Sequence, residues 1–111
     1  MLTRRIGPFE VSEIGLGCMS LSHAYGVPPD AAVGVALLNR ALDIGHTFLD
    51  TAALYGLGAN ETLLGQAVMH RRDEFVLASK CGIIRNAEGK REINGRPDLI
   101  KQTCEESLSR L

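Results

Sequence analysis

An acid, a phenol and an ammonium group occur close together in the middle of this sequence. Asp50 follows the apolar run 47–49, Tyr55 lies five residues further on, and Lys80 follows the apolar run 75–79. The trio suits carbonyl reduction, because the alkoxide that hydride addition leaves must be protonated. A tyrosine with a pKa of about 10 is a poor acid at neutral pH. A neighbouring ammonium makes it a stronger acid, and a carboxylate would orient that ammonium and keep it charged.

Both apolar runs have the composition of short strands. The ends of neighbouring parallel strands are only about 5 Å apart, so Asp50, Tyr55 and Lys80 could meet at one rim of a sheet. Each residue alone has an ordinary explanation: Tyr55 as a loop aromatic, Asp50 as a cap of a helix or turn, Lys80 as a solvated strand end. Their joint occurrence at strand ends separated by a helix-sized gap favours a catalytic site.

The rest of the chain alternates strands and helices. A hairpin is predicted over residues 2–10, and strands over 14–19, 47–50 and 75–80. Asp30 is expected to cap a first helix that Gly45 ends, and Asn60 to cap a second. Residues 85–95 are predicted to be a loop, and Pro97 to open a third helix. The expected apolar faces of these helices are, in order, Val33, Leu37, Leu38, Ala41 and Leu42; Leu63, Leu64, Ala67 and Val68; and Ile100, Cys104, Leu108 and Leu111.

Three strand-and-helix units at this spacing predict parallel strands with right-handed crossovers. By periodicity alone, a doubly wound sheet and a barrel fit equally well. The first strand lacks the GxGxxG pattern of a dinucleotide-binding sheet, because Gly15 and Gly17 match only two of its positions.

Four segments of the sequence resemble the aldo-keto reductase family, and in particular its auxin-induced-type bacterial and plant group. The acid-and-tyrosine loop corresponds to Asp50-Thr51-Ala52 with Tyr55-Gly56. Gly58, Asn60-Glu61 and Leu64-Gly65 resemble the segment that follows this loop in the family. Ser79-Lys80 with Gly82 resembles the family's lysine strand, and Gly15 to Met19 resembles the end of its first barrel strand. One departure is His46, where the family usually has a branched aliphatic residue. Another is that the family's fourth catalytic residue, a histidine on the fourth barrel strand, lies beyond Leu111.

The resemblance implies an α/β fold, the N-terminal part of a (β/α)8 TIM barrel, over residues 1–111. It would comprise the hairpin and three βα units, with the barrel incomplete. It implies an NADP(H)-dependent enzyme that reduces aldehydes or ketones. Tyr55 would be the general acid, Lys80 would lower its pKa and Asp50 would orient Lys80. Gly17, Cys18, Met19 and Asp50 would border the cofactor.

Two alternatives to an active enzyme remain open. One is a non-catalytic, nucleotide-sensing module similar to potassium-channel beta subunits, and the other is an inactive remnant. The chain ends while the apolar pattern of its last helix is still running, so we interpret it as an N-terminal portion and expect it to be inactive alone. An open parallel sheet also leaves unpaired edges, which predicts self-association.

Composition narrows the other functional classes. The chain has 111 residues, 45% of them hydrophobic, and a net charge of −1. No block of like charge indicates nucleic acid or an anionic membrane, and no apolar run approaches the ~18 residues of a membrane helix. The three cysteines contain no CxxC, which favours a reduced, cytoplasmic protein. The three histidines are scattered, so no metal site is predicted.

Overall fold

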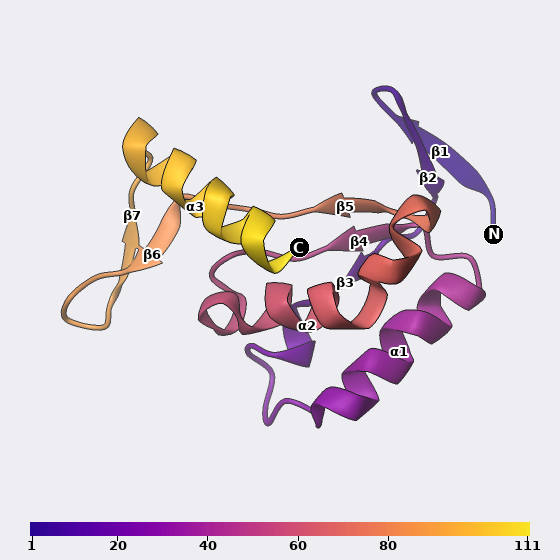
Figure 1. Ribbon diagram of the computed structural model, residues 1–111, viewed down its shortest axis with the longest axis horizontal. Helices are drawn as coiled ribbons and strands as arrows, with labels where there is room; N and C mark the ends of the chain where they lie inside the picture. Colours follow the sequence, from indigo (N-terminus) through magenta and orange to yellow (C-terminus); the bar gives the residue numbers. More distant parts are fainter.

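A three-stranded parallel sheet lies at the centre of the computed structural model, which describes residues 1–111. Its strands are β3 (Leu16–Gly17), β4 (Phe48–Asp50) and β5 (Val76–Ala78), in the order β3-β4-β5. β3 and β5 both pair in parallel with β4, so that Leu49 stands between Leu16 and Leu77. The predicted parallel strands are therefore confirmed, although each is shorter than expected, and the sheet is open rather than closed into a barrel (Figure 1).

Helices follow the strands of this sheet in the predicted alternation. They are α1 (Ala31–Asp43), α2 (Ala59–Val68) and α3 (Pro97–Arg110). Short 3-10 turns are η1 (Met19–Leu21), η2 (Tyr55–Gly58) and η3 (Met69–Glu74). α1 and α2 lie side by side on one face of the sheet, and the C-terminal end of α3 reaches α2 (Figure 1). The layer of helices therefore covers a single face.

Two antiparallel hairpins lie at opposite ends of the parallel sheet (Figure 1). The first, β1 (Thr3–Ile6) with β2 (Phe9–Ser12), lies where β4 begins: the Ser12 amide donates to the Thr47 hydroxyl at 2.7 Å. The second pairs β6 (Ile83–Arg85) with β7 (Arg91–Ile93) beyond the end of β5. The prediction of a loop over 85–95 is therefore wrong for Arg85 and for β7, and correct for the turn over 86–90 that joins the two strands. Backbone amides of Glu88 and Lys90 donate to the side chain of Asn86, and this tight turn lets its polar flanks pair.

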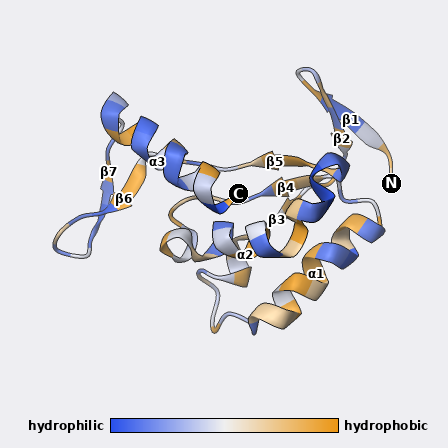
Figure 2. Cartoon of the chain, in the orientation of Figure 1, coloured by the Kyte–Doolittle hydropathy of each residue, from blue (hydrophilic) through white to orange (hydrophobic).

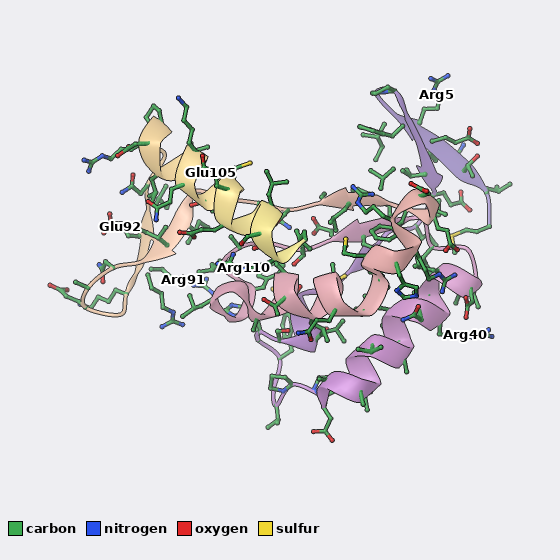
Figure 3. All side chains as sticks on the ribbon, viewed as in Figure 1. Arg5, Arg40, Arg91, Glu92, Glu105 and Arg110 are labelled. Atoms are coloured by element: carbon green, nitrogen blue, oxygen red, sulfur yellow. The ribbon has the colours of Figure 1, made fainter.

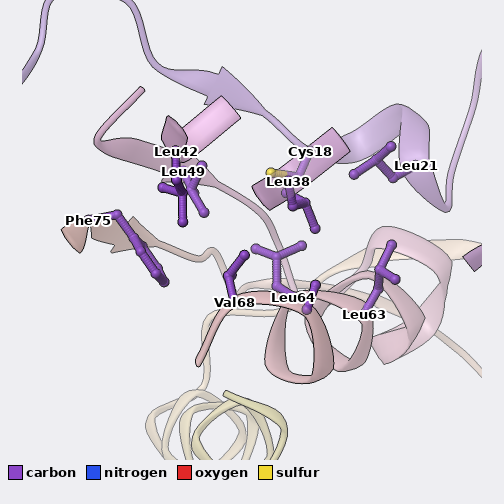
Figure 4. Packing of buried hydrophobic residues seen from close by; sticks show 10 residues of the cluster. Cys18, Leu21, Leu38, Leu42, Leu49, Leu63, Leu64, Val68 and Phe75 are labelled. Atoms are coloured by element: carbon purple, nitrogen blue, oxygen red, sulfur yellow. The ribbon is translucent and has the colours of Figure 1, made fainter. Parts of the chain in front are cut away.

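The hydrophobic core fills the space between the sheet and the two covering helices (Figure 4). Successive side chains of a strand point to opposite faces. In β4, Leu49 is therefore fully buried against the helices, while Phe48 and Asp50 line the other, open face. The buried cluster comprises Cys18, Leu21, Leu38, Leu42, Leu49, Leu63, Leu64, Ala67, Val68 and Phe75. The predicted apolar face of α2 is confirmed in full.

The two ends of α1 compare differently with their predictions. Gly45 ends the helix as expected: its amide donates to the carbonyl of Leu42 at 3.0 Å, and its φ of +99° lets the His46 amide reach the carbonyl of Ala41 at 3.0 Å. Asp30 does precede the helix, but its carboxylate makes no capping bond. Its backbone carbonyl instead accepts from the amides of the first turn.

The buried faces of α1 and α3 correct two predictions. On α1, Leu38 is buried, but Val33 and Leu37 remain 54% and 42% exposed because no element covers them. Of the apolar face expected for α3, Ile100, Cys104 and Leu108 are exposed, Leu108 at 72%, and Leu111 alone packs against the core. The half-buried side is formed by Leu99, Thr103, Ser107 and Arg110. α3 is mostly hydrophilic (Figure 2), so its contact with α2 is polar rather than apolar. None of the helices combines the length and hydropathy that crossing a membrane requires.

Candidate active site

The C-terminal ends of β4 and β5 bring Asp50 and Lys80 together. Asp50 pairs with Ala78 in the ladder between the two strands. Beyond the last paired residues the ladder continues, because the Thr51 amide donates to the Ala78 carbonyl at 2.9 Å and the Ala53 amide to the Lys80 carbonyl at 3.1 Å. This backbone pairing holds Lys80 beside the end of β4, although thirty residues separate it from Asp50.

The Lys80 ammonium has three oxygen acceptors. Its Nζ donates to Oδ1 and Oδ2 of Asp50 at 2.8 and 2.9 Å, and to the backbone carbonyl of Thr51 at 2.7 Å. Partial burial lowers the pKa of Lys80, but hydrogen bonding to Asp50 and to Tyr55 outweighs it, so the pKa lies above its ordinary value. Lys80 is therefore charged at neutral pH, as the sequence predicted.

Tyr55 opens the turn η2 directly above this ion pair. Lys80 Nζ lies 5.1 Å from the centre of the Tyr55 ring, within the range of a cation–π contact. The ring also stacks on His23, with 5.8 Å between ring centres. The meeting of Asp50, Tyr55 and Lys80 that the sequence predicted is therefore found, and the stacking of His23 on Tyr55 is a feature that no local pattern indicated.

A shallow cavity of about 180 Å³ opens beside these residues. Its walls are Ala52, Leu54, Tyr55, Lys80, Cys81 and Ile83. The chain's other tyrosine, Tyr25, lies outside the cavity and is 86% exposed. Cys81 is exposed and lines the same cavity, three residues beyond the end of β5 at Ala78.

The residues predicted to border a cofactor differ in how far they are exposed to solvent. Gly17 pairs with Asp50, is exposed, and has open space where a Cβ would stand. The Cys18 side chain is fully buried in the core, which raises the pKa of its thiol to about 11. Met19 begins η1 and is half-buried. Of the three, Gly17 is the residue that leaves its backbone open to a ligand beside Asp50.

Asn60 is a buried residue of the site, not the helix cap that the sequence predicted. α2 begins at Ala59, so Asn60 lies inside the helix, and the residue that precedes the helix is Gly58 in a left-handed conformation (φ +94°). The Asn60 side chain accepts from the Thr51 hydroxyl at 2.6 Å and donates to the Cys18 carbonyl at 2.8 Å. It thereby ties the end of β3 to the residue that follows Asp50. An asparagine near a helix start has the same local pattern in either role, so only its tertiary neighbours distinguish them.

Comparison with known proteins agrees with this geometry. The family model described as the aldo/keto reductase family matches residues 13–111. The aldo-keto reductase yakc [NADP(+)] of Schizosaccharomyces pombe is 42% identical over 98% of the chain and 33% of its own length. The probable aldo-keto reductase 1 of Glycine max is 39% identical over 93% of this chain and 30% of its own length.

Solved structures extend the agreement to the fold. The holo form of aldo-keto reductase AKR11C1 from Bacillus halodurans superposes with a TM-score of 0.85 at 36% identity, covering 100% of this chain and 36% of that one. The open sheet and its helices therefore correspond to part of a TIM barrel, which decides between the two architectures that periodicity left open. The chain spans about a third of the length of the curated relatives it matches. With 99 of its 111 residues covered by the family model, the chain belongs to the aldo/keto reductase family.

Proposed function

We propose that this chain supplies the acid, tyrosine and lysine of an NADPH-dependent oxidoreductase that reduces aldehydes or ketones to alcohols. The observation that carries the proposal is the position of Lys80. Its ammonium is bonded to both oxygens of Asp50 while it faces the ring of Tyr55. Such a group lowers the cost of forming a phenolate, which is what a tyrosine needs in order to act as an acid at neutral pH.

The open face of the sheet beside Asp50 fits the reactive end of a nicotinamide cofactor. A flat ring could approach the backbone at Gly17, because no atom lies within 4 Å of the position where a Cβ would stand. The relative in S. pombe carries NADP(+) in its name, which supports the choice of cofactor. When bound, NADPH supplies the hydride that reduces the carbonyl carbon.

The protein's own residues then supply the proton and shield the reacting carbonyl from water. Tyr55 donates its hydroxyl proton to the carbonyl oxygen as negative charge develops there. Lys80 stabilises the resulting phenolate, and Asp50 keeps the ammonium in place. The apolar walls of the cavity, Leu54 and Ile83 among them, exclude water from the reacting carbonyl and strengthen these charge interactions.

A chimeric barrel tests the proposal, because the chain spans only part of its relatives. Residues 13–111 would replace the matching residues of S. pombe yakc, and NADPH oxidation would be followed with a small aldehyde. The chimera should turn over, and Tyr55→Phe should lower its rate by about 10²–10⁴, the usual contribution of a general acid. Cofactor affinity should change little, because the hydroxyl acts on the substrate.

Tyr25→Phe is the matched control, since Tyr25 is the chain's other tyrosine and is almost fully exposed. It should leave the rate unchanged. A folded chimera that binds NADPH without turnover would instead indicate a nucleotide-sensing role. A Tyr55→Phe chimera that kept its rate would show that the proton comes from another group.

A further inference from the structure

Glu61 is a fully buried carboxylate that the proposed proton transfer does not use. Its side chain has no exposed surface, although it carries a charge. Burying an isolated carboxylate is costly, so such groups are retained in proteins with partners that compensate them. The partners of Glu61 therefore indicate what the charge does.

The two oxygens of Glu61 bond to different elements. Oε2 accepts from the Ser79 hydroxyl at 2.7 Å, immediately beyond β5. Oε1 accepts from the Ser107 hydroxyl at 3.1 Å and from the Arg110 guanidinium at 2.8 Å, both on α3. Arg110 points from α3 toward α2 in Figure 3. The carboxylate thus joins α2 to α3 on one side and to the end of β5 on the other.

Ser79 is the residue that precedes Lys80. The two side chains leave the backbone in different directions, because the Ser79 hydroxyl reaches Glu61 on α2 while the Lys80 ammonium reaches Asp50. A bond that fixes the Ser79 side chain also fixes the rotation of the backbone at Lys80.

Asn60, which precedes Glu61 in α2, is linked to the same lysine through Thr51 at the end of β4. It accepts from the Thr51 hydroxyl, and the Thr51 carbonyl accepts from Lys80 Nζ. Consecutive residues in the first turn of α2 therefore hold the two backbone segments between which the ammonium lies.

We propose that Glu61 is a positioning residue for Lys80, acting through Ser79 to hold the ammonium on Asp50 and beneath Tyr55. The assignment rests on the proposed function for its catalytic meaning. Its structural content is independent of activity: the Glu61–Ser79 bond sets how tightly the ammonium of Lys80 is held. A carboxylate that only clamped α3 to α2 would act through Ser107 and Arg110 and leave Lys80 unaffected.

Competitive acetylation of lysines in the 111-residue chain separates these roles. The chain has three lysines, and Lys90 and Lys101 are exposed internal references. Acetic anhydride reacts with the free amine, so limiting reagent followed by mass spectrometry should label Lys80 more slowly than the references. Ser79→Ala should raise the labelling of Lys80 relative to them by about threefold, because an ammonium that is held less tightly on Asp50 yields the free amine more readily.

Ser107→Ala is the matched control, because it removes a bond of similar kind from the other oxygen of Glu61. It should leave the labelling ratio of Lys80 unchanged. Ser79→Thr keeps a hydroxyl at this position and should therefore show the wild-type labelling ratio. Glu61→Leu removes both sets of bonds and should match Ser79→Ala if it folds; the serine variants decide the outcome if it does not.

The proposal is overturned if Ser79→Ala retains its far-UV circular dichroism and its Lys80 ratio, or if the two serine variants shift the ratio equally. Neither readout requires turnover. An inactive chimera would therefore contradict the proposed reductase function and leave this result standing.

Discussion

Lys80 donates hydrogen bonds to both carboxylate oxygens of Asp50 from the end of the neighbouring strand. The pair is half-exposed, at 50% and 39% of the two side chains. Exposed ion pairs contribute about 0–1 kcal/mol to stability. The pair on the open face of the sheet therefore adds little to the stability of the fold, and its larger effect is expected in the chemistry proposed for Tyr55.

Removing Lys80 should reduce activity more than stability. In the chimera, Lys80→Met should lower the rate of NADPH oxidation by at least about tenfold, because it removes the positive charge beside the tyrosine that donates the proton, while the urea midpoint changes little. Asp50→Asn should give a smaller fall, because the ammonium remains but loses its orienting charge. Lys101→Met, at an exposed position of α3, is the control. Wild-type rates in both site variants would show that the cluster is structural.

The three thiols should differ sharply in reactivity. Cys81 and Cys104 are exposed, whereas Cys18 is buried. Ellman's reagent at neutral pH should therefore modify Cys81 and Cys104 in the native chain and Cys18 only after denaturant is added. Rapid native modification of all three would place Cys18 outside the core.

Cys18 should also make stability depend on alkaline pH. The pKa of its thiol is raised from 9.0 to about 11 by burial, so the unfolded chain releases this proton first. The contribution is fully present below pH 9 and is lost as the pH rises through about 11. Urea midpoints should fall across this window less steeply in Cys18→Ala than in the wild type. Parallel curves would contradict the assignment.

Gly65 should be essential for the contact of α2 with α3. A Cβ at this position would stand 1.9 Å from the backbone carbonyl oxygen of Arg110, which cannot move without displacing α3. Gly65→Ala should therefore destabilise the chain by about 1–3 kcal/mol, the usual cost of overpacking. Chemical denaturation followed by circular dichroism measures this directly.

Gly34→Ala in α1 provides the comparison. A Cβ there would meet only the tip of the flexible Leu63 side chain, at 3.0 Å. Both substitutions gain the same helix propensity, about 1 kcal/mol, so the difference between them reports the contact with Arg110. Equal effects would mean that α3 packs elsewhere in solution.

The isolated 111-residue chain should show no measurable carbonyl reduction. Its sheet leaves β3 and β5 unpaired at their outer edges, and one face has no covering layer. Catalysis requires reacting groups held within a small tolerance, which an open sheet does not provide. Apolar side chains such as Val33 and Leu57 are exposed, so the chain should bind ANS and self-associate in sedimentation experiments. A monodisperse monomer that reduces an aldehyde at ordinary enzyme rates would contradict this prediction.

Local patterns in the sequence were sufficient for much of the fold. The spacing of Leu63, Leu64, Ala67 and Val68 depends only on helical periodicity, and all four are buried. Gly45 ends α1 because a left-handed residue is needed there whatever surrounds it. The proximity of Asp50, Tyr55 and Lys80 could be predicted because parallel strands place their carboxyl ends at one rim of the sheet.

Tertiary structure alone decided the roles of residues whose partners are distant. Glu61 lies 46 and 49 residues from Ser107 and Arg110, and no local pattern distinguishes its buried carboxylate from an exposed one in a first helical turn. The same holds for Asn60, expected as a cap and found bonded to Thr51 and Cys18. The face of α3 that meets α2 was also mispredicted. Apolar periodicity identifies a face only where burial is hydrophobic, and this helix is held by hydrogen bonds and an ion pair.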